Sequence, residues 1–402
     1  MKNHKQVSTK RGTSGNKVFW IISAVLLGIV MWAVISSTNE NSTTSSEIRI
    51  ELPEFTSVTP QDDPVADIAR DSIKEYQKWL ENHPTSDALE GYKPVHAKMA
   101  KKLAAHGIMI KEKVDFDSDY YPDIMNPIKV RLDKKGWAAD FIAPMMTPDA
   151  NGNARTIAFC YIAKIIAKKS GTTIGMSGSK IVYDHEIVGD VYSVKVPGYT
   201  YSALTDNKRI RQFLPYYVDQ AKDVLASIKD DSIDPIQKLQ WKFKRGVSDQ
   251  EAFQVILSDL IESSYQHELQ HVKDDVLANS ETINRSRMSN EGRVMMKTVI
   301  EARGIMGQVA YSKASIYAVS HLRHWCKARD PQFKGAGQIA GGFLDRNEAI
   351  TNDKSVMEME QTIRAWGEKG LRKSDPFYNE IVENLQKGDP NPVLTAAKKL
   401  GL

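Results

Sequence analysis

The sequence of 402 residues is poor in cysteine and has little net charge. Its two cysteines, Cys160 and Cys326, are too few for a disulfide scaffold or a four-cysteine zinc site, and they could form at most one bridge. Glycine and proline occur in ordinary amounts, which excludes a collagenous or low-complexity chain. With 41% hydrophobic residues, the composition is that of a folded globular protein.

Positive charge is concentrated at the N-terminus. Five basic residues and no acidic residue lie within positions 1–17, and the other 385 residues carry 49 basic and 50 acidic side chains. This nearly neutral body lacks the basic surface that nucleic-acid binding requires, so we expect no nucleic-acid partner. The basic character belongs to the tail.

One long hydrophobic run follows this tail. No charged residue occurs from Val18 to Asn39, and a helix over 18–37 would span the roughly 30 Å hydrocarbon core of a bilayer. The positive-inside rule then makes 1–17 a cytoplasmic tail and predicts a single-pass protein whose C-terminal part is periplasmic or extracellular. A cleaved signal peptide would have a shorter apolar region, and a buried core helix would have a polar face. Both remain alternatives to the membrane anchor.

The pattern after the predicted span divides into three parts. We expect a flexible linker over 38–58, because it begins with the polar stretch SSTNENSTTSS, which cannot bury surface. An N-terminal helical and β-hairpin part over 59–245 and a second part over 246–402 follow. Apolar periodicity predicts helices at 64–82, 87–106, 155–168, 249–278, 291–315 and 355–369, and two β-rich runs within 172–203 joined near Gly189-Asp190. Helices on both sides of a small sheet indicate an α+β fold.

The most informative motif is His267-Glu268-Leu269-Gln270-His271, an H-E-x-x-H sequence inside a helical run. Positions i and i+4 share one face of an α-helix, so both imidazoles can reach one ion. Zinc accepts two such nitrogens and keeps a position open for water, toward which the intervening glutamate can act as a general base. Two surface histidines placed so by chance are the alternative.

These residues resemble the zincin metallopeptidases. The resemblance implies a zincin-like, helix-rich fold over 246–402, one Zn²⁺ bound by His267 and His271, and Glu268 as the catalytic residue. It covers about residues 250–315 and favours a bacterial inner membrane as the location. It also implies a peptide or protein substrate, which an edge strand from the expected hairpin near 180–197 would align.

The third zinc ligand is open between two glutamates. The extended form H-E-x-x-H-x-x-G-x-x-H fails, because Asp274 and Leu277 stand where Gly and His are needed. A gluzincin-like glutamate is the alternative, and Glu291 lies 20 residues after His271, a spacing that resembles thermolysin-type enzymes. Glu301 interrupts an otherwise apolar helix, where a metal, Arg303 or another basic residue would relieve the cost of burying a carboxylate, and we favour Glu301.

The expected activity is hydrolysis of peptide bonds by a membrane-anchored, zinc-dependent metallopeptidase. Tyr311, His321 and His324 are candidates for hydrogen-bonding an oxyanion, although each is more often structural when it occurs singly. Two other functions are open: a catalytically inactive zincin-like binding or scaffold protein, and a zinc hydrolase that acts on a non-peptide cell-wall amide.

Overall fold

Helices and a mixed sheet make up the part of the chain that the computed structural model describes, which is 50–84, 87–116, 118–148, 154–196, 202–206, 208–229, 239–241, 247–278, 288–328, 331–343 and 356–402. The strands are β1 (Thr56–Ser57), β2 (Trp137–Pro148), β3 (Ala154–Ile174), β4 (Lys180–Ser193), β5 (Ala203–Asp206) and β6 (Arg209–Phe213). The helices are α2 (Pro64–Asn82), α3 (Ala88–Ala104), α4 (Tyr121–Asp133), α5 (Leu214–Lys229), α7 (Asp249–Lys273), α8 (Asp275–Ala278), α10 (Asn290–Tyr311), α11 (Ser315–Cys326), α12 (Pro331–Phe343), α13 (Val356–Gln386) and α14 (Pro392–Leu400). The predicted α+β class is confirmed.

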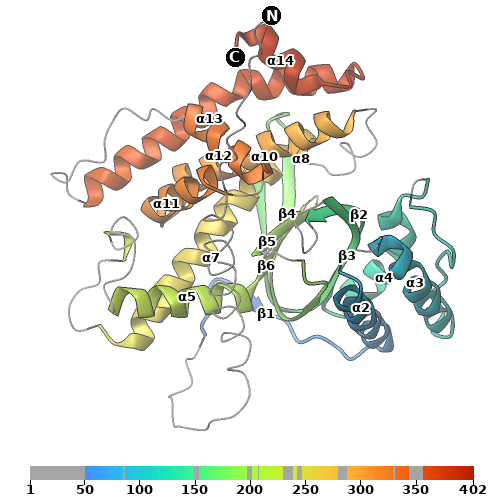
Figure 1. Ribbon diagram of the computed structural model, residues 1–402. Coiled ribbons are helices and arrows are strands. Elements are labelled where there is room, and N and C mark those ends of the chain that lie inside the picture. The colour runs from blue at the N-terminus through green and yellow to red at the C-terminus, as the bar shows by residue number, and fades with distance from the viewer. Residues whose placement is uncertain are drawn as a thin grey trace, which may run out of the picture. The chain divides into compact units, whose positions relative to one another are not determined.

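The six strands form one curved sheet with helices on both sides (Figure 1). Their order is β1-β3-β4-β6-β5, and β2 also pairs with β3. All pairs are antiparallel except β4 with β6, which are parallel. Helices α2, α3 and α4 cover one side, and α5 and α7 contact the other, where α10 to α13 continue the helical layer.

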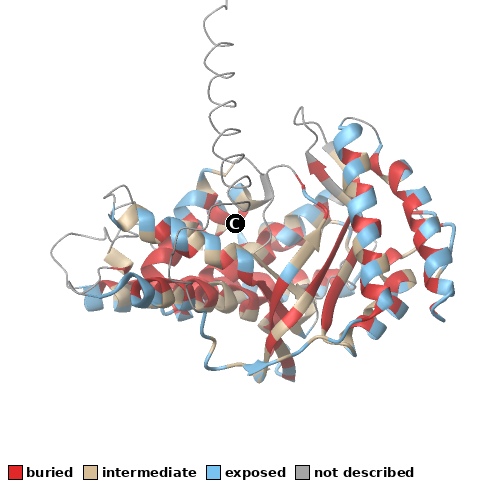
Figure 2. Cartoon of the chain, turned by 90° about the horizontal axis from the view of Figure 1, so that it is seen from below, coloured by how far each residue is buried: buried red, intermediate tan, exposed pale blue. Residues whose placement is uncertain are grey.

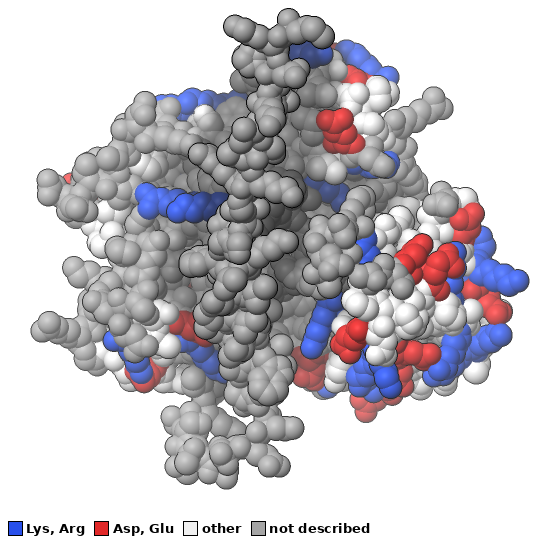
Figure 3. All heavy atoms as spheres, in the orientation of Figure 1, with Lys and Arg blue, Asp and Glu red and all other residues white. Residues whose placement is uncertain are grey.

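Buried residues follow the inner faces of these helices and the middle of the central strands (Figure 2). One core cluster joins α2, α3 and α4 to β2 and β3, and a second joins α5 to the first half of α7. Ile50–Leu402 form one compact unit. On the face seen in Figure 3, Lys and Arg side chains are interspersed with Asp and Glu over the α2–α4 part.

The predicted helices at 64–82 and 87–106 are confirmed as α2 and α3. Asp63 caps α2, its side chain accepting from the Val65 N–H, and Pro64 stands at the first helical position. Helix α3 ends at Ala104, and Gly107, whose φ of 75° is left-handed, lies three residues beyond that end. The helices predicted at 249–278, 291–315 and 355–369 correspond to α7 with α8, α10 and the longer α13.

The predicted helix at 155–168 is wrong, because this segment is part of strand β3. Residues 157–163 are all at most 3% exposed, since helices cover one face of the strand and neighbouring parts of the fold cover the other. A strand buried on both faces has a continuous apolar run in place of the alternation that identifies strands. Only the surroundings distinguish such a run from a helix.

The predicted hairpin near Gly189-Asp190 is also wrong. Both residues lie inside β4, where Asp190 has a φ of 47° and the β3–β4 register shifts between Ile162 and Lys164. The glycine and the aspartate therefore mark a β-bulge. The turn lies instead between β3 and β4 at 175–179. Strand β4 is interior, so the expectation that 180–197 supplies an edge strand is wrong as well; β5 ends the strand order.

Several predictions concern residues outside the described ranges. The tail at 1–17, the span at 18–37, most of the linker at 38–58 and the boundary at 245/246 lie there. Among the helices of the described residues, none has the length and apolar character needed to cross a bilayer. Cys160 and Cys326 are both free, Cys160 being buried in the sheet.

Candidate metal centre

Helix α7 carries the H-E-x-x-H motif in its C-terminal half. Its start is fixed by a capping box, in which the Ser248 side chain accepts from the Glu251 N–H and the Glu251 carboxylate accepts from the Ser248 N–H. Phe253, Ile256 and Leu260 anchor the first half in the core cluster shared with α5. The motif thus stands on a helix that is held at both its start and its buried face.

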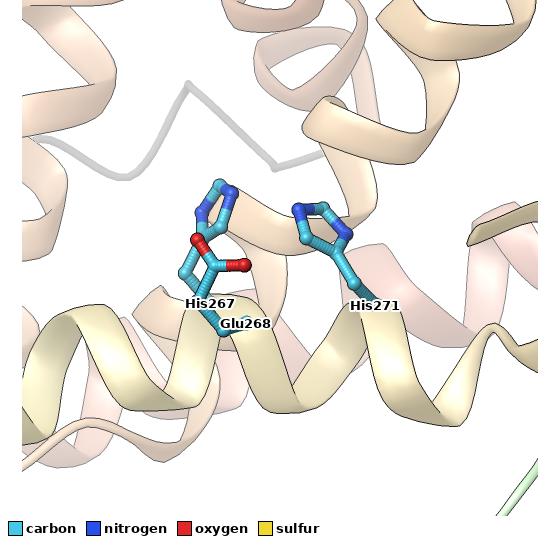
Figure 4. A group of neighbouring side chains, drawn as sticks. All are labelled: His267, Glu268 and His271. Atoms are coloured by element: carbon cyan, nitrogen blue, oxygen red, sulfur yellow. The ribbon is translucent and has the colours of Figure 1, made fainter. Parts of the chain in front are cut away.

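The two histidines project from the same side of α7, and the Glu268 carboxylate lies beside them (Figure 4). The two imidazole rings meet edge to face, with ring centroids 4.7 Å apart. One ligand atom from each of His267, Glu268 and His271 lies within 4.8 Å of the others. All three side chains are buried, at 7–8% exposure. The predicted convergence of the two imidazoles is present.

Glu301 of α10 meets both imidazoles. Its Oε2 lies 3.2 Å from His267 Nε2 and 3.9 Å from His271 Nε2. Glu291 begins the same helix ten residues earlier, about 15 Å along the axis, and is exposed. Of the two candidate third ligands, the fold brings Glu301 to the histidines.

Arg303 does not pair with Glu301. Its Nε donates to both carboxylate oxygens of Asp274, at 3.0 and 2.9 Å, and one terminal nitrogen donates to Ser374 and Asp375 of α13. Asp274 and Arg303 are at most 1% exposed. Arg303 is thus engaged elsewhere, at the end of α7, and the basic residue whose charge acts on Glu301 is Lys297, one turn earlier on α10.

Two glycines let α10 approach α7 closely. A Cβ at Gly304 would lie 2.6 Å from His267 Nε2 and 2.7 Å from His271 Cε1, and a Cβ at Gly307 would lie 2.8 Å from the Gln270 Cβ. Any larger residue at 304 would occupy the space of the imidazoles. Gly304 is one turn after Glu301, so the same close approach brings the carboxylate to the histidines.

Glu268 is held from the sheet. Thr205 of β5 donates its hydroxyl proton to Glu268 Oε2 at 2.6 Å. Burial raises the pKa of Glu268 above its ordinary value, with Thr205 and His267 opposing the rise. A raised pKa suits a carboxylate that takes up and returns a proton near neutral pH.

The other three side chains form a coupled set. Burial and the charge of His267 lower the pKa of His271 to about 4. Burial opposes protonation of His267, but the bond to Glu301 prevails and raises the pKa of His267. Burial opposes ionisation of Glu301, but the two imidazoles prevail and lower its pKa. The set therefore pairs the Glu301 carboxylate with the His267 imidazole and favours a neutral His271, and one carboxylate with two imidazoles is a mixture of donors suited to a divalent metal.

The donor set fits zinc. Two ligand atoms at about 2.0–2.1 Å from one tetrahedral ion are roughly 3.4 Å apart, close to the 3.2 and 3.9 Å between Glu301 and the two imidazoles. Two neutral nitrogens and one carboxylate are a ligand set of catalytic zinc sites.

The candidate oxyanion residues differ in their distance from this centre. His321 of α11 accepts a hydrogen bond from Trp325 Nε1 at 3.1 Å, and the Trp325 ring meets His267 edge to face at 5.6 Å. His324 is exposed, and Tyr311 is 39% exposed with the Lys273 amine over its ring. His321 is the one joined to the site, through Trp325.

Sequence reasoning missed three residues of the site: Thr205, Gly304 and Trp325. Thr205 is 63 positions before Glu268, on a strand of four residues with no apolar alternation to mark it. Gly304 could have been found from the sequence. A glycine inside a helix often marks a place where another element packs closely, and this glycine lies one turn after Glu301.

Comparison with known proteins adds no assignment: no protein-family model, curated protein sequence or solved structure matches this chain.

Proposed function

We propose that this protein is a zinc-dependent metallopeptidase of the gluzincin-like type, with His267, His271 and Glu301 as the zinc ligands and Glu268 as the catalytic residue. The observation that carries the proposal is the meeting of Glu301 with both imidazoles of the H-E-x-x-H helix, 3.2 and 3.9 Å from their Nε2 atoms. Glu301 comes from a different helix, 30 residues after His271 in the chain. If the two histidines had this spacing by chance, a carboxylate from another helix would not be expected beside both of them.

Zinc bound at this centre would supply a Lewis acid that polarises a substrate carbonyl and makes water more acidic. The chain would do the rest. The Glu268 carboxylate would accept a proton from the attacking water and deliver it to the leaving amine. Thr205 would orient Glu268 through its hydroxyl, and burial would keep bulk water from competing for the carboxylate.

The proposal includes a location. We infer that residues 18–37 anchor the protein in a bacterial inner membrane and that the catalytic part faces the periplasm or the outside. The support is the charge asymmetry around the apolar run, with five basic residues before it and Glu40 as the first charge after it.

The test compares the purified full-length chain, kept in a mild detergent, with single variants. Bound metal is measured after loading with zinc, and hydrolysis is measured on a peptide library and on murein fragments. We expect about one zinc per chain, lost in His271→Ala and weakened at least tenfold in Glu301→Gln. Glu291→Gln is the matched control, because it removes a carboxylate from the same helix outside the site. Glu268→Gln should retain zinc and lose at least 100-fold in turnover.

Each other outcome selects a rival. Zinc binding without hydrolysis of either substrate would indicate a zincin-like binding or scaffold protein. Hydrolysis of murein fragments alone would indicate a cell-wall amide hydrolase. A folded chain that takes up no zinc would exclude the whole proposal, and a loss of zinc in Glu291→Gln would exclude the assigned third ligand.

A further inference from the structure

A second site candidate is a cavity of about 330 Å³ between the end of α4, the segment 58–61 and strands β3, β4 and β6. Six charged side chains line it: Asp133, Lys134, Lys135, Lys168, Glu186 and Arg209. Its volume is at the small end of the range for sites that bind small molecules. Its location and its charge, rather than its size, indicate what it could hold.

The cavity and the metal centre lie on opposite faces of the sheet. His185 of β4 stacks against Tyr265 of α7, with ring centroids 4.5 Å apart, so it points to the face that α7 covers. Successive residues of a strand point to opposite faces, and Glu186 points into the cavity. A ligand here would therefore be distinct from anything bound at His267 and His271.

The floor of the cavity is a closed set of ion pairs. Arg211, which is 1% exposed, donates to Glu186 Oε2 at 2.9 Å and to Asp133 at 3.4 Å. Arg209 pairs with the other carboxylate oxygen of Asp133. Two guanidinium groups thus balance two carboxylates, and these acidic residues are not available to bind a cationic ligand.

Three lysines remain around the mouth. Lys168 pairs with Asp184 at 2.9 Å and lies 3.8 Å from Glu186, while Lys135 donates to the uncharged amide of Gln61 at 2.7 Å. Lys134 is exposed beside Lys135. Together with the two arginines, the three lysines leave an excess of two positive charges over Asp133, Glu186 and Asp184. A ligand with two negative charges would balance this excess.

The walls are held in place without a ligand. The Gln61 N–H donates to the Lys135 carbonyl at 2.9 Å, and Trp137 Nε1 donates to the Gln61 carbonyl at 2.8 Å. Gly136, which lies between Lys135 and Trp137, has a φ of 78° and turns the chain there. A Cβ at this position would lie 3.1 Å from the Pro60 Cα. The lysines therefore stand on a fixed turn, so little ordering would oppose binding.

We propose that this cavity binds a small phosphomonoester, a ligand with two negative charges on one group and a small organic part. Lysine ammonium groups bind phosphate as point charges, and the Thr59 hydroxyl in the wall adds a donor. The cavity is larger than a bare phosphate ion requires, which leaves room for the organic part. This inference does not depend on the proposed peptidase activity.

The test is calorimetric titration of the full-length chain with glycerol 3-phosphate at constant ionic strength. Inorganic phosphate, succinate and chloride are titrated in parallel. We expect saturable binding at one site, weaker for inorganic phosphate, and at least tenfold weaker for the ester in Lys134→Ala/Lys135→Ala. Lys78→Ala/Lys102→Ala is the control, because it removes two exposed lysines from α2 and α3.

Four outcomes would overturn the proposal. The first is that glycerol 3-phosphate shows no saturable binding, and the second is that chloride gives the same heat. The third is that succinate or inorganic phosphate binds as tightly as the ester or more tightly. The fourth is that the control variant loses as much affinity as Lys134→Ala/Lys135→Ala. The lysines at 134 and 135 lie at the mouth, so their removal leaves the Arg211 ion pairs intact, and an unchanged thermal midpoint verifies this.

Discussion

At the scale of single residues, Gly304 is the position on which the candidate metal centre depends most directly without being a ligand. It lies opposite the imidazoles of His267 and His271. These rings cannot move away from an added Cβ, because both are buried and Trp325 packs against His267. Position 304 thus requires glycine for steric reasons, although it supplies no ligand atom. A side chain of one carbon is enough to test this.

We expect Gly304→Ala to weaken zinc binding at least tenfold and to destabilise the fold by about 1–3 kcal/mol, because its Cβ would overlap the His267 and His271 rings. Zinc affinity is measured by competition with a chelator, and stability by urea unfolding of the zinc-free chain. Gly342→Ala on α12 is the matched control, since its Cβ would meet no atom within 4 Å. Unchanged zinc affinity in Gly304→Ala would show that the rings do not need this space.

At the scale of elements, the centre depends on how α7 and α10 are held together. The Asp274–Arg303 pair joins the end of α7 to α10, and Arg303 continues to Ser374 and Asp375 of α13. The Gln270 side chain donates to the Asp274 carboxylate at 2.7 Å, and the Tyr378 hydroxyl donates to the backbone carbonyl of Asp274 at 2.6 Å. The ligand-bearing helices therefore share one buried polar junction near His271 and Glu301.

We expect Asp274→Asn to lower the free energy of unfolding by about 3 kcal/mol, because the buried Arg303 guanidinium loses its buried charged partner and keeps only Asp375, which is 37% exposed. Chemical denaturation of the zinc-free chain measures the change. The exposed pair Glu383–Lys387 is the control, and Glu383→Gln should cost less than about 1 kcal/mol. Equal small effects in both variants would mean that the junction contributes no more than a surface pair.

Strand β4 and α7 are also joined through a histidine. His185 Nε2 donates to Gln212 Oε1 at 2.6 Å, and its ring stacks on Tyr265, two residues before the H-E-x-x-H motif. Burial lowers the pKa of His185 to about 3, with Lys169 adding to the effect and Gln212 and Glu54 opposing it. The neutral imidazole is therefore the form that the fold requires.

This shift predicts acid sensitivity. Between about pH 6.5 and pH 3 the unfolded chain binds a proton at His185 that the folded chain does not, so stability falls as the pH falls through this window. The contribution reaches about 1.4 kcal/mol per pH unit. His185→Gln should reduce the slope of unfolding free energy against pH by up to that amount, whereas Tyr183→Phe on the same strand, which removes no imidazole, should not. An identical slope in His185→Gln would contradict the prediction.

At the scale of the whole molecule, a metal at this centre would join segments that are far apart in the chain. His267 and Glu301 are separated by 34 positions, and Glu268 is held by Thr205 from the sheet. A ligand that binds only the folded chain stabilises it by mass action. The stability of the folded chain is therefore expected to depend on free zinc.

We expect a chelator to lower the thermal midpoint, and zinc at about 1,000 times its dissociation constant to add about 4 kcal/mol relative to the chelated chain. Thermal unfolding in matched buffers measures both. His271→Ala, which removes one ligand, should show no difference between chelator and zinc. A chelator effect of equal size in that variant would place the responsible metal elsewhere.

Local features could be predicted from the sequence alone. The H-E-x-x-H motif depends only on the 3.6-residue period of a helix, and the same period in the apolar residues predicts α2 and α3. The α+β class follows from such local patterns. The preference for Glu301 over Glu291 also came from a local argument, the cost of a carboxylate in an apolar helix.

The tertiary structure decided what no local pattern contains. Residues 155–168 lie in strand β3, whose stretch 157–163 is buried on both faces, and Gly189-Asp190 is a bulge because β4 continues through it to pair with β3. Thr205 reaches Glu268, and Arg303 turns to Asp274 rather than Glu301, because of how β5, α7 and α10 pack. The periodicity of apolar residues predicts which face of a helix or strand is buried. It does not predict which other element packs against that face, because that depends on contacts between segments far apart in the sequence. The candidate site is built from such contacts.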